Sequence, residues 1–216
     1  VQMCIRDSYI DVIRALEPFT VGLDAVAHAL VRVVQRVEGR DLRAAAGSGV
    51  HGGGGEMPGL SFVFVGKMRE RHYAEAFEEY FKRLGAFGKP ELREIAEERL
   101  PEQPSEKEIA RALEREAAEI EKAVPKGAYV VALCVEGREM SSPELARTLD
   151  AVMGAGASKL CFVVGGSFGL HERVKRVADL RLSMSRMTFP HHLARVMLAE
   201  QVYRAFTIIN GGRYHK

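Results

Sequence analysis

The chain of 216 residues lacks several features that would settle its class at once. It has no tryptophan and three cysteines, Cys4, Cys134 and Cys161, without CxxC spacing. This small, odd number argues against a disulfide-stapled secreted module and a structural zinc site, and it indicates a reducing, cytoplasmic compartment. No apolar run reaches the roughly 18 to 20 residues that span a bilayer, so we expect no membrane role.

A strong excess of charge is also missing. The chain has 31 Lys and Arg residues and 29 Asp and Glu residues, which gives a formal net charge of +2 at pH 7. This balance does not by itself indicate a nucleic-acid-binding protein, so a basic surface would have to arise from local clustering. With 47% hydrophobic and 28% charged residues, the composition is that of an ordinary globular protein and excludes wholesale disorder.

Lysine is absent from residues 1–56, which contain six arginines, whereas residues 57–216 contain every lysine of the chain. Apolar residues at helical spacing in 23–37 predict one helix, and the glycine-rich stretch 47–55 follows it. Two interpretations stay open. Either Met57 is the true initiator and residues 1–56 are not native coding sequence, or residues 1–56 are a helical extension on a glycine linker. In both, we expect residues 57–216 to be the functional domain.

That second part alternates between strand and helix patterns. The apolar runs and their flanking turns predict strands at 60–65, 92–97, 129–135, 160–164 and 180–184. Helices are predicted at 70–84, 105–123, 141–153, 171–177 and 193–209, two of them opened by Ser105 with Glu108 and by Ser141 with Glu144. The alternation indicates an α/β fold with a largely parallel sheet.

Ligands of such sheets bind beyond the carboxyl ends of the strands, which here are residues 133–137, 165–169 and 183–192. The run from Gly165 to Gly169 would let backbone amides approach a ligand, although it matches neither a dinucleotide fingerprint nor a phosphate loop. We expect Gly165→Val to obstruct that ligand and leave the fold nearly intact. Glycines that merely turn the chain into the next helix are an equally compatible interpretation.

The segment 183–191 mixes small hydroxyls, apolar side chains and Pro190, as a loop around an adenine ring would. An ordinary connection between a strand and a helix is an alternative. His191 and His192 are adjacent, so we expect their side chains to diverge and not to share a metal.

Cations and aromatic residues are interleaved toward the C-terminus, among them Arg195, Tyr203, Arg204 and Tyr214. This combination suits an RNA surface, although a solvated helix face would have the same composition. The charged segment 91–119 is expected to carry no site.

Residues 57–216 resemble the small, single-domain bacterial family of large-subunit rRNA pseudouridine-N3 methyltransferases, RlmH, in the SPOUT superfamily. The segments that carry the resemblance are Val65-Gly66-Lys67, 162–170, 187–191, Arg195, 200–206 and Tyr214-His215-Lys216. Residues 1–56 have no counterpart in that family, whose usual start corresponds to Met57.

The resemblance implies a SPOUT-type parallel sheet with a C-terminal trefoil knot, a homodimer, and S-adenosylmethionine as methyl donor. It implies a pseudouridine in helix 69 of 23S rRNA as the substrate, in assembled ribosomes, and no metal. The family's cofactor contacts correspond to Leu133, Gly165, Met184, Ser185, Arg186, Met187, Thr188 and Phe189. The candidates for proton handling, base contact or phosphate contact are His191, Arg195, Tyr214 and His215.

Three alternatives stay open. The first is a knotted methyltransferase that acts on another RNA such as tRNA. The second is a non-catalytic ribosome-binding protein that keeps the pocket. The third is a flavodoxin-like nucleotide-binding module, which the missing phosphate loop after the first strand disfavours.

Overall fold

A computed structural model describes residues 57–212 and residue 214. The strands are β1 (Gly59–Val65), β2 (Lys89–Ile95), β3 (Tyr129–Glu139), β4 (Lys159–Val164) and β5 (Leu180–Ser183). The helices are α3 (Arg71–Leu84), α4 (Glu106–Ala123), α5 (Ser142–Gly154), α6 (Glu172–Val177) and α7 (His191–Ile209). The expectations for residues 1–56 lie outside the described part of the chain. None of the helices in this described part combines the length and the apolar character of a membrane-spanning helix.

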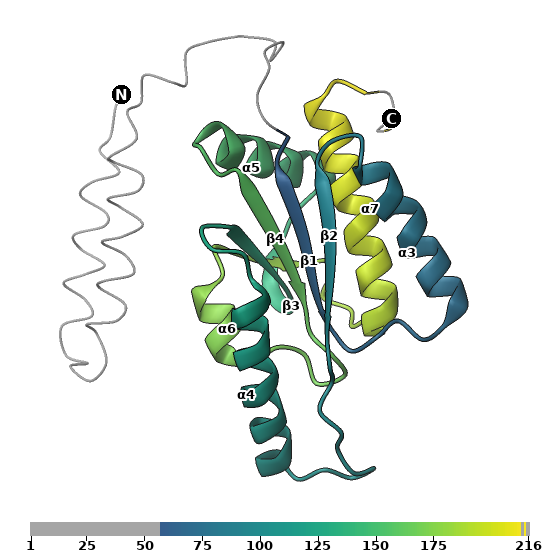
Figure 1. Ribbon diagram of the computed structural model, residues 1–216, viewed down its shortest axis with the longest axis vertical. Helices are drawn as coiled ribbons and strands as arrows, with labels where there is room; N and C mark the ends of the chain where they lie inside the picture. The colour runs from purple at the N-terminus through teal and green to yellow at the C-terminus, as the bar shows by residue number, and fades with distance from the viewer. Residues whose placement is uncertain (1–56, 213, 215–216) are drawn as a thin grey trace, which may run out of the picture. The chain divides into compact units, whose positions relative to one another are not determined.

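The five strands form one parallel sheet in the order β2-β1-β4-β3-β5 (Figure 1). The predicted α/β class with a parallel sheet is therefore confirmed. A flavodoxin-like sheet has the order 2-1-3-4-5, which places the third strand beside the first. Here β4 lies between β1 and β3, so the flavodoxin-like alternative is wrong.

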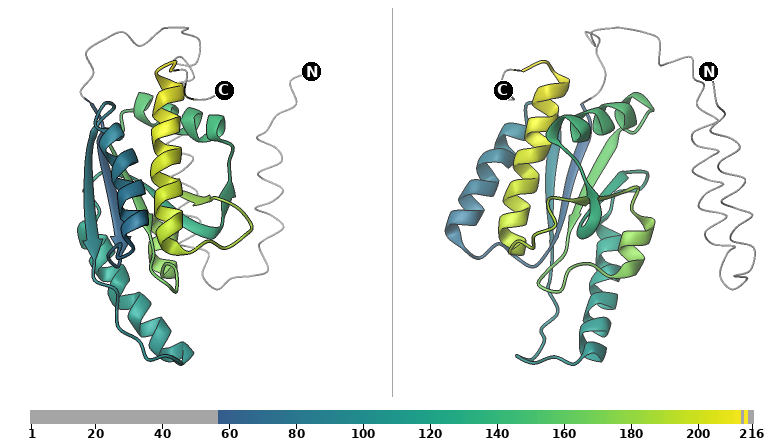
Figure 2. Two further views of the ribbon diagram at one scale, coloured as in Figure 1. Left: turned by 90° about the vertical axis from the view of Figure 1, so that its right-hand side faces the viewer. Right: turned by 180° about the vertical axis from the view of Figure 1, so that it is seen from behind.

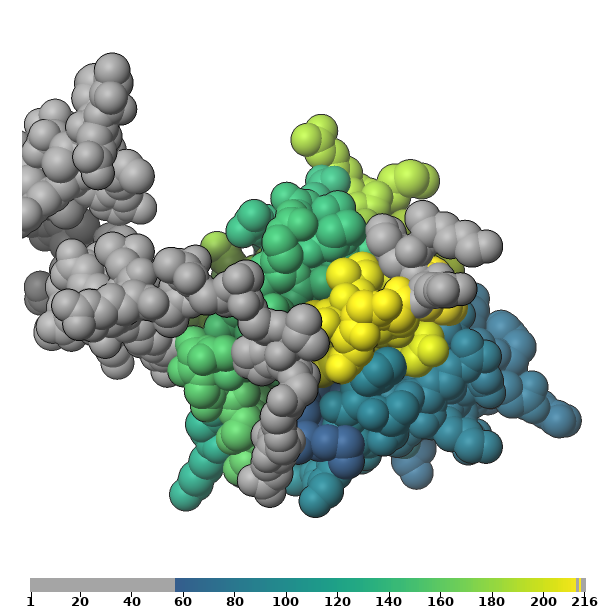
Figure 3. All heavy atoms as spheres, turned by 90° about the horizontal axis from the view of Figure 1, so that it is seen from above, coloured from purple at the N-terminus to yellow at the C-terminus, as the bar shows by residue number. Residues whose placement is uncertain are grey.

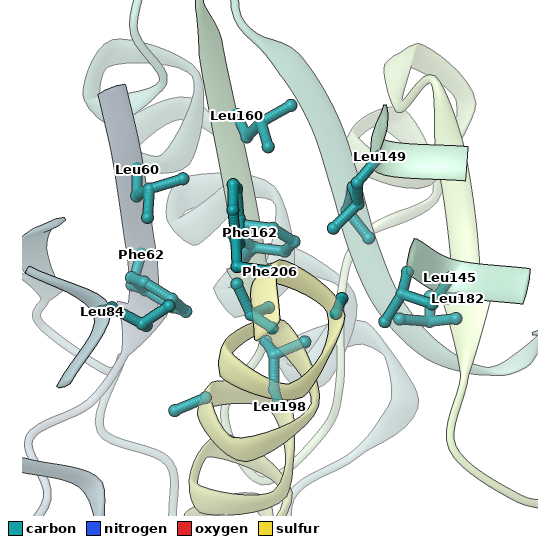
Figure 4. Close-up of a cluster of buried hydrophobic side chains, with 14 of the residues drawn as sticks. Leu60, Phe62, Leu84, Leu145, Leu149, Leu160, Phe162, Leu182, Leu198 and Phe206 are labelled. Carbon is teal, nitrogen blue, oxygen red and sulfur yellow. The ribbon is translucent and has the colours of Figure 1, made fainter. Parts of the chain in front are cut away.

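Helices cover both faces of the sheet, because side chains alternate along its buried central strands. Leu60 and Phe62 of β1 belong to the cluster that includes α3, α5 and α7, whereas Val63 and Val65 pack with residues of α4 and α6. The views in Figures 1 and 2 show α3 and α7 side by side on one face. In Figure 4, Phe162 of β4 lies among residues of β1 and α7 in the larger cluster.

The starts of α4 and α5 follow from local chemistry. Ser105 and Ser141 each accept a hydrogen bond from the backbone N–H three residues later. In return, the glutamate at that later position accepts a hydrogen bond from the backbone N–H of the serine. By contrast, α7 begins at His191, two residues before its predicted start, directly after Pro190. The strand β2 spans Lys89–Ile95 and not 92–97, because its pairing with β1 sets its position at an exposed sheet edge.

The strand β3 is longer than predicted and contains a large bulge. Leu182 of β5 pairs with both Leu133 and Arg138 of β3, so the residues between those two are displaced from the ladder. Gly137 makes the close approach possible, because a Cβ at this position would lie 2.6 Å from the backbone carbon of Leu182. The bulge lies in the second half of β3, beside β5.

Candidate functional site

A cavity of about 740 Å³ opens beyond the carboxyl ends of β3, β4 and β5. Its walls are the β3 bulge, the glycine-rich turn after β4, the loop after β5 and the first turn of α7. This volume is in the range of small-molecule and cofactor sites. Seven of the eight predicted cofactor residues line it: Leu133, Gly165, Met184, Ser185, Met187, Thr188 and Phe189.

The eighth, Arg186, does not line the cavity. Its side chain is 93% exposed and its Nε lies 3.2 Å from Glu139 Oε1 at the end of β3. The loop around it is held by two further hydrogen bonds: Ser183 donates to the carbonyl of Ser185 (2.9 Å), and the Met187 N–H donates to the Ser185 hydroxyl (3.0 Å). The loop therefore presents Met187 and Arg186 outward from a fixed turn.

Gly165 is required by its own turn. A Cβ at residue 165 would lie 2.1 Å from the carbonyl oxygen of Gly169, and Gly169 itself has a positive φ of 79°. The expectation that Gly165→Val would leave the fold nearly intact is therefore wrong. The side chain would meet the protein backbone, whether or not a ligand is bound.

The same turn is stabilised by Glu97, which lies in the charged segment 91–119 that was expected to carry no site. Glu97, just beyond β2, accepts hydrogen bonds from the N–H and the hydroxyl of Ser167, both at 2.9 Å. Burial alone would raise the pKa of Glu97, but the bonds from Ser167 lower it below its ordinary value. Glu97 is not among the residues that line the cavity, so the expectation that 91–119 carries no site stays a prediction, but Glu97 fixes the turn that forms one wall of the cavity.

The β3 bulge contributes charged groups to the opposite wall. Lys175 of α6 donates to Glu136 and, at 2.9 Å, to Glu172. Although burial would lower it, the pKa of Lys175 is raised by these two carboxylates. Burial raises the pKa of the neighbouring Cys134 thiol, so this cysteine is protonated at neutral pH. Glu136 belongs to the predicted strand end 133–137, whereas Lys175 was not a candidate, because its approach to Glu136 depends on the bulge.

His191 lines the cavity at the first residue of α7. Burial, and then the charge of Arg195, lower the pKa of His191 below 6.5, so its ring is neutral at pH 7. The ring of His192 lies with its centroid 4.1 Å away, so the two side chains do not diverge as expected. Nδ1 of His192 contacts Glu70. No group of three or more metal-binding side chains occurs within the described residues.

Arg195 is fully buried, at 0% exposure. Its guanidinium donates to the carbonyl oxygens of Val65 and, at 3.1 Å, Gly66, and lies 5.1 Å from the centroid of Phe64. Burial lowers the pKa of Arg195 to about 10. With no exposed surface, Arg195 holds the end of β1 against α7, and the structure gives it a positioning role in place of the expected phosphate contact.

Tyr214 lies beyond the C-terminal end of α7 and does not line the cavity. Its hydroxyl donates to Glu200 Oε1 (3.1 Å), and the Arg204 guanidinium lies 4.6 Å from its ring centroid. Burial and its hydrogen bonds raise the pKa of Tyr214 to about 12. Glu200 is nine residues from His191, roughly 14 Å along a helix. His215 lies outside the described residues.

A second cavity, of about 600 Å³, lies between α3, α5 and α7. It is lined by Tyr80, Met140, Pro143 and Met197 among others, and Ser142 donates to Gln201 (2.7 Å) beside it. Viewed from above, Figure 3 shows the yellow surface of α7 between the blue surface of the α3 region and the green surface of the α5 region.

Known proteins resemble this chain over the same part. A family model described as "Predicted SPOUT methyltransferase" matches residues 59–215. "Ribosomal RNA large subunit methyltransferase H" of Bacillus pumilus (strain SAFR-032) is 45% identical over 157 residues, which cover 73% of this chain and 99% of that protein. Proteins of the same name from Listeria monocytogenes serotype 4a (strain HCC23) and Clostridioides difficile (strain 630) are each 43% identical with the same coverage. The chain therefore belongs to the SPOUT methyltransferase family, beside the proteins named ribosomal RNA large subunit methyltransferase H.

Proposed function

We propose that residues 57–216 transfer a methyl group to N3 of a pseudouridine in helix 69 of 23S rRNA, within assembled ribosomes. An rRNA substrate is supported by the names of relatives that align over 99% of their own length. The finer choice of nucleotide rests on the motifs at 162–170 and 187–191. Because ribosomes are cytoplasmic in bacteria, we place the protein there.

The observation that carries the proposal is the cavity at the carboxyl ends of three neighbouring strands. SPOUT methyltransferases use S-adenosylmethionine as methyl donor. The cavity fits this molecule in volume, and in lining it combines apolar side chains such as Leu133 and Phe189 with the backbone of a glycine turn. Leu133, Gly165 and the loop 184–189 would hold the donor, with Arg186 at its outer edge.

When bound, the donor supplies an electrophilic methyl group on a sulfonium ion. The acceptor N3 must lose its proton, and His191 is the cavity residue suited to take it, because a ring nitrogen of a neutral imidazole accepts protons at pH 7. Arg195 contributes indirectly, since it ties α7, which begins with His191, to the end of β1. Positioning of the two reactants supplies much of the acceleration.

We also propose that the C-terminal segment forms the trefoil knot of the superfamily. Two features support this. The chain leaves β5 at one edge of the sheet, and α7 then packs against both α5 and α3. The helix α3 directly precedes β2, the strand at the other edge. The close crossing of the β3 bulge and β5 at Gly137 occurs where the segment 184–190 departs.

A homodimer through α7 and its neighbours completes the proposal. The cavity between α3, α5 and α7 offers apolar side chains, including Met140 and Met197, to a second copy. Analytical ultracentrifugation at micromolar concentration tests this, and a monomer that still methylates would contradict it. We further propose that residues 1–56 have no part in the activity. A chain that starts at Met57 should match the full chain in melting temperature and turnover.

The test of function is methyl transfer from labelled donor to ribosomes, free 23S rRNA and tRNA, with the modified nucleotide identified by mass spectrometry. We expect label at N3 of a helix 69 pseudouridine, and only with ribosomes. Label in tRNA would establish the alternative substrate, and donor binding with no transfer to any RNA would favour a non-catalytic ribosome-binding protein.

A further inference from the structure

Exposed apolar side chains gather at the mouth of the donor cavity. Six large hydrophobic residues are exposed in the described part of the chain, and three of them line this one cavity: Val135 (51%), Phe168 (48%) and Met187 (71%). They come from three different segments: the β3 bulge, the turn after β4 and the loop after β5. Water-exposed apolar groups that converge on one opening indicate a surface that is covered in use.

Two cations near this opening already have partners. Lys175 is bonded to Glu136 and Glu172, and Arg186 is paired with Glu139. These two cations are therefore less available to a ligand than the three exposed apolar side chains.

Phe168 is held more firmly than an exposed residue of a loop usually is. It lies between Ser167, which donates twice to Glu97, and Gly169, which forms an isolated bridge with Gly166. Because the backbone is fixed on both sides of Phe168, only the two side-chain torsions of its ring have to become ordered when a ligand binds. A rigid aromatic surface loses little entropy when a flat ligand stacks on it.

We propose that Phe168 is the stacking surface for the methyl-accepting nucleobase, with Val135 and Met187 as the apolar rim of its entry. The proposal rests on the function proposed above. The acceptor must reach the donor through the mouth of the cavity, and enzymes that modify a base extrude it and bind it between aromatic or apolar side chains. A second protein copy is a poorer occupant, because a stable interface buries about 800 Å² on each partner. Three side chains around an opening offer much less.

The test compares Phe168→Ala with Phe168→Tyr, which keeps the aromatic face. Val177→Ala is the matched control, because Val177 is an exposed apolar residue (64%) at the end of α6 that does not line the cavity. For each variant, the ribosome concentration that gives half-maximal single-turnover transfer is measured beside calorimetric donor affinity and melting temperature.

We expect Phe168→Ala to raise the half-maximal ribosome concentration by about 5- to 150-fold, the range for loss of one stacked base, with donor affinity unchanged. Phe168→Tyr and Val177→Ala should stay within about 3-fold of the wild type. The proposal is overturned if Phe168→Ala acts like the wild type, if Phe168→Tyr is as impaired as Phe168→Ala, or if donor affinity falls instead. A wild-type chain that methylates no ribosomes would refute the proposed function itself, which is a separate result.

Discussion

Replacing Gly165 by alanine is the smallest change that probes the wall of the donor cavity. The added Cβ would lie 2.1 Å from the carbonyl oxygen and 2.4 Å from the carbonyl carbon of Gly169, where an ordinary contact needs at least 3.4 Å. The turn must therefore open by about 1.3 Å. Overpacking a well-packed site costs typically about 1–3 kcal/mol, and here the obstacle is a backbone carbonyl group, so we expect a loss of about 3 kcal/mol or more in unfolding free energy.

Gly154→Ala is the control for this prediction. Gly154 is the last residue of α5, has no positive φ, and has no atom within 4 Å of an added Cβ. Alanine there should stabilise the protein by up to about 1 kcal/mol. Urea denaturation gives both free energies, and calorimetry well below the melting temperature gives donor affinity, which we expect to fall in Gly165→Ala alone. A Gly165→Ala protein with wild-type stability and donor affinity would refute the reasoning.

Three further predictions concern buried ionisable groups. Arg195→Met should cost a net of about 1–3 kcal/mol in urea denaturation, because two carbonyl oxygens lose their donor while the expense of burying a cation is removed; a wild-type value would contradict this. His191→Ala should lower turnover by roughly 10²-fold without changing donor affinity, and the wild-type rate should be flat above pH 6.5 and fall only below it, because the lowered pKa keeps the ring neutral. Unchanged turnover would exclude His191 as the base. Burial raises the pKa of Glu116, so the stability that its protonated form contributes is present below about pH 4.5 and lost as pH rises through the folded-state pKa. Glu116→Gln, which can still accept from the Glu98 N–H, should therefore stabilise the protein more at pH 8 than at pH 4, and equal effects would refute the assignment.

The parts of the fold that depend on nearby residues could be predicted from the sequence. The serine–glutamate pairs that open α4 and α5 act over three residues, and the apolar run of β1 is buried on both faces. The β3 bulge was missed because its cause is the pairing with β5, some 45 residues later, and the polar run Glu136-Gly137-Arg138 gives no strand signal.

The candidate site shows the same division. The glycine turn and the loop at 183–191 were predicted from their position after strands, and the cavity brings most of those residues together. Glu97 was dismissed because its importance depends on Ser167, 70 residues away. Arg195 was expected at the surface, as arginines on amphipathic helices usually are, but its acceptors are backbone carbonyls about 130 residues earlier, which leave no trace in the sequence pattern.

The most direct test of the donor site is a crystal structure with S-adenosylhomocysteine, the product form of the donor. We predict density for the whole ligand in the cavity at the ends of β3, β4 and β5, in contact with Leu133, Gly165 and Thr188. Density in the second cavity between α3, α5 and α7, or an empty first cavity under conditions where calorimetry shows saturation, would contradict the proposed site.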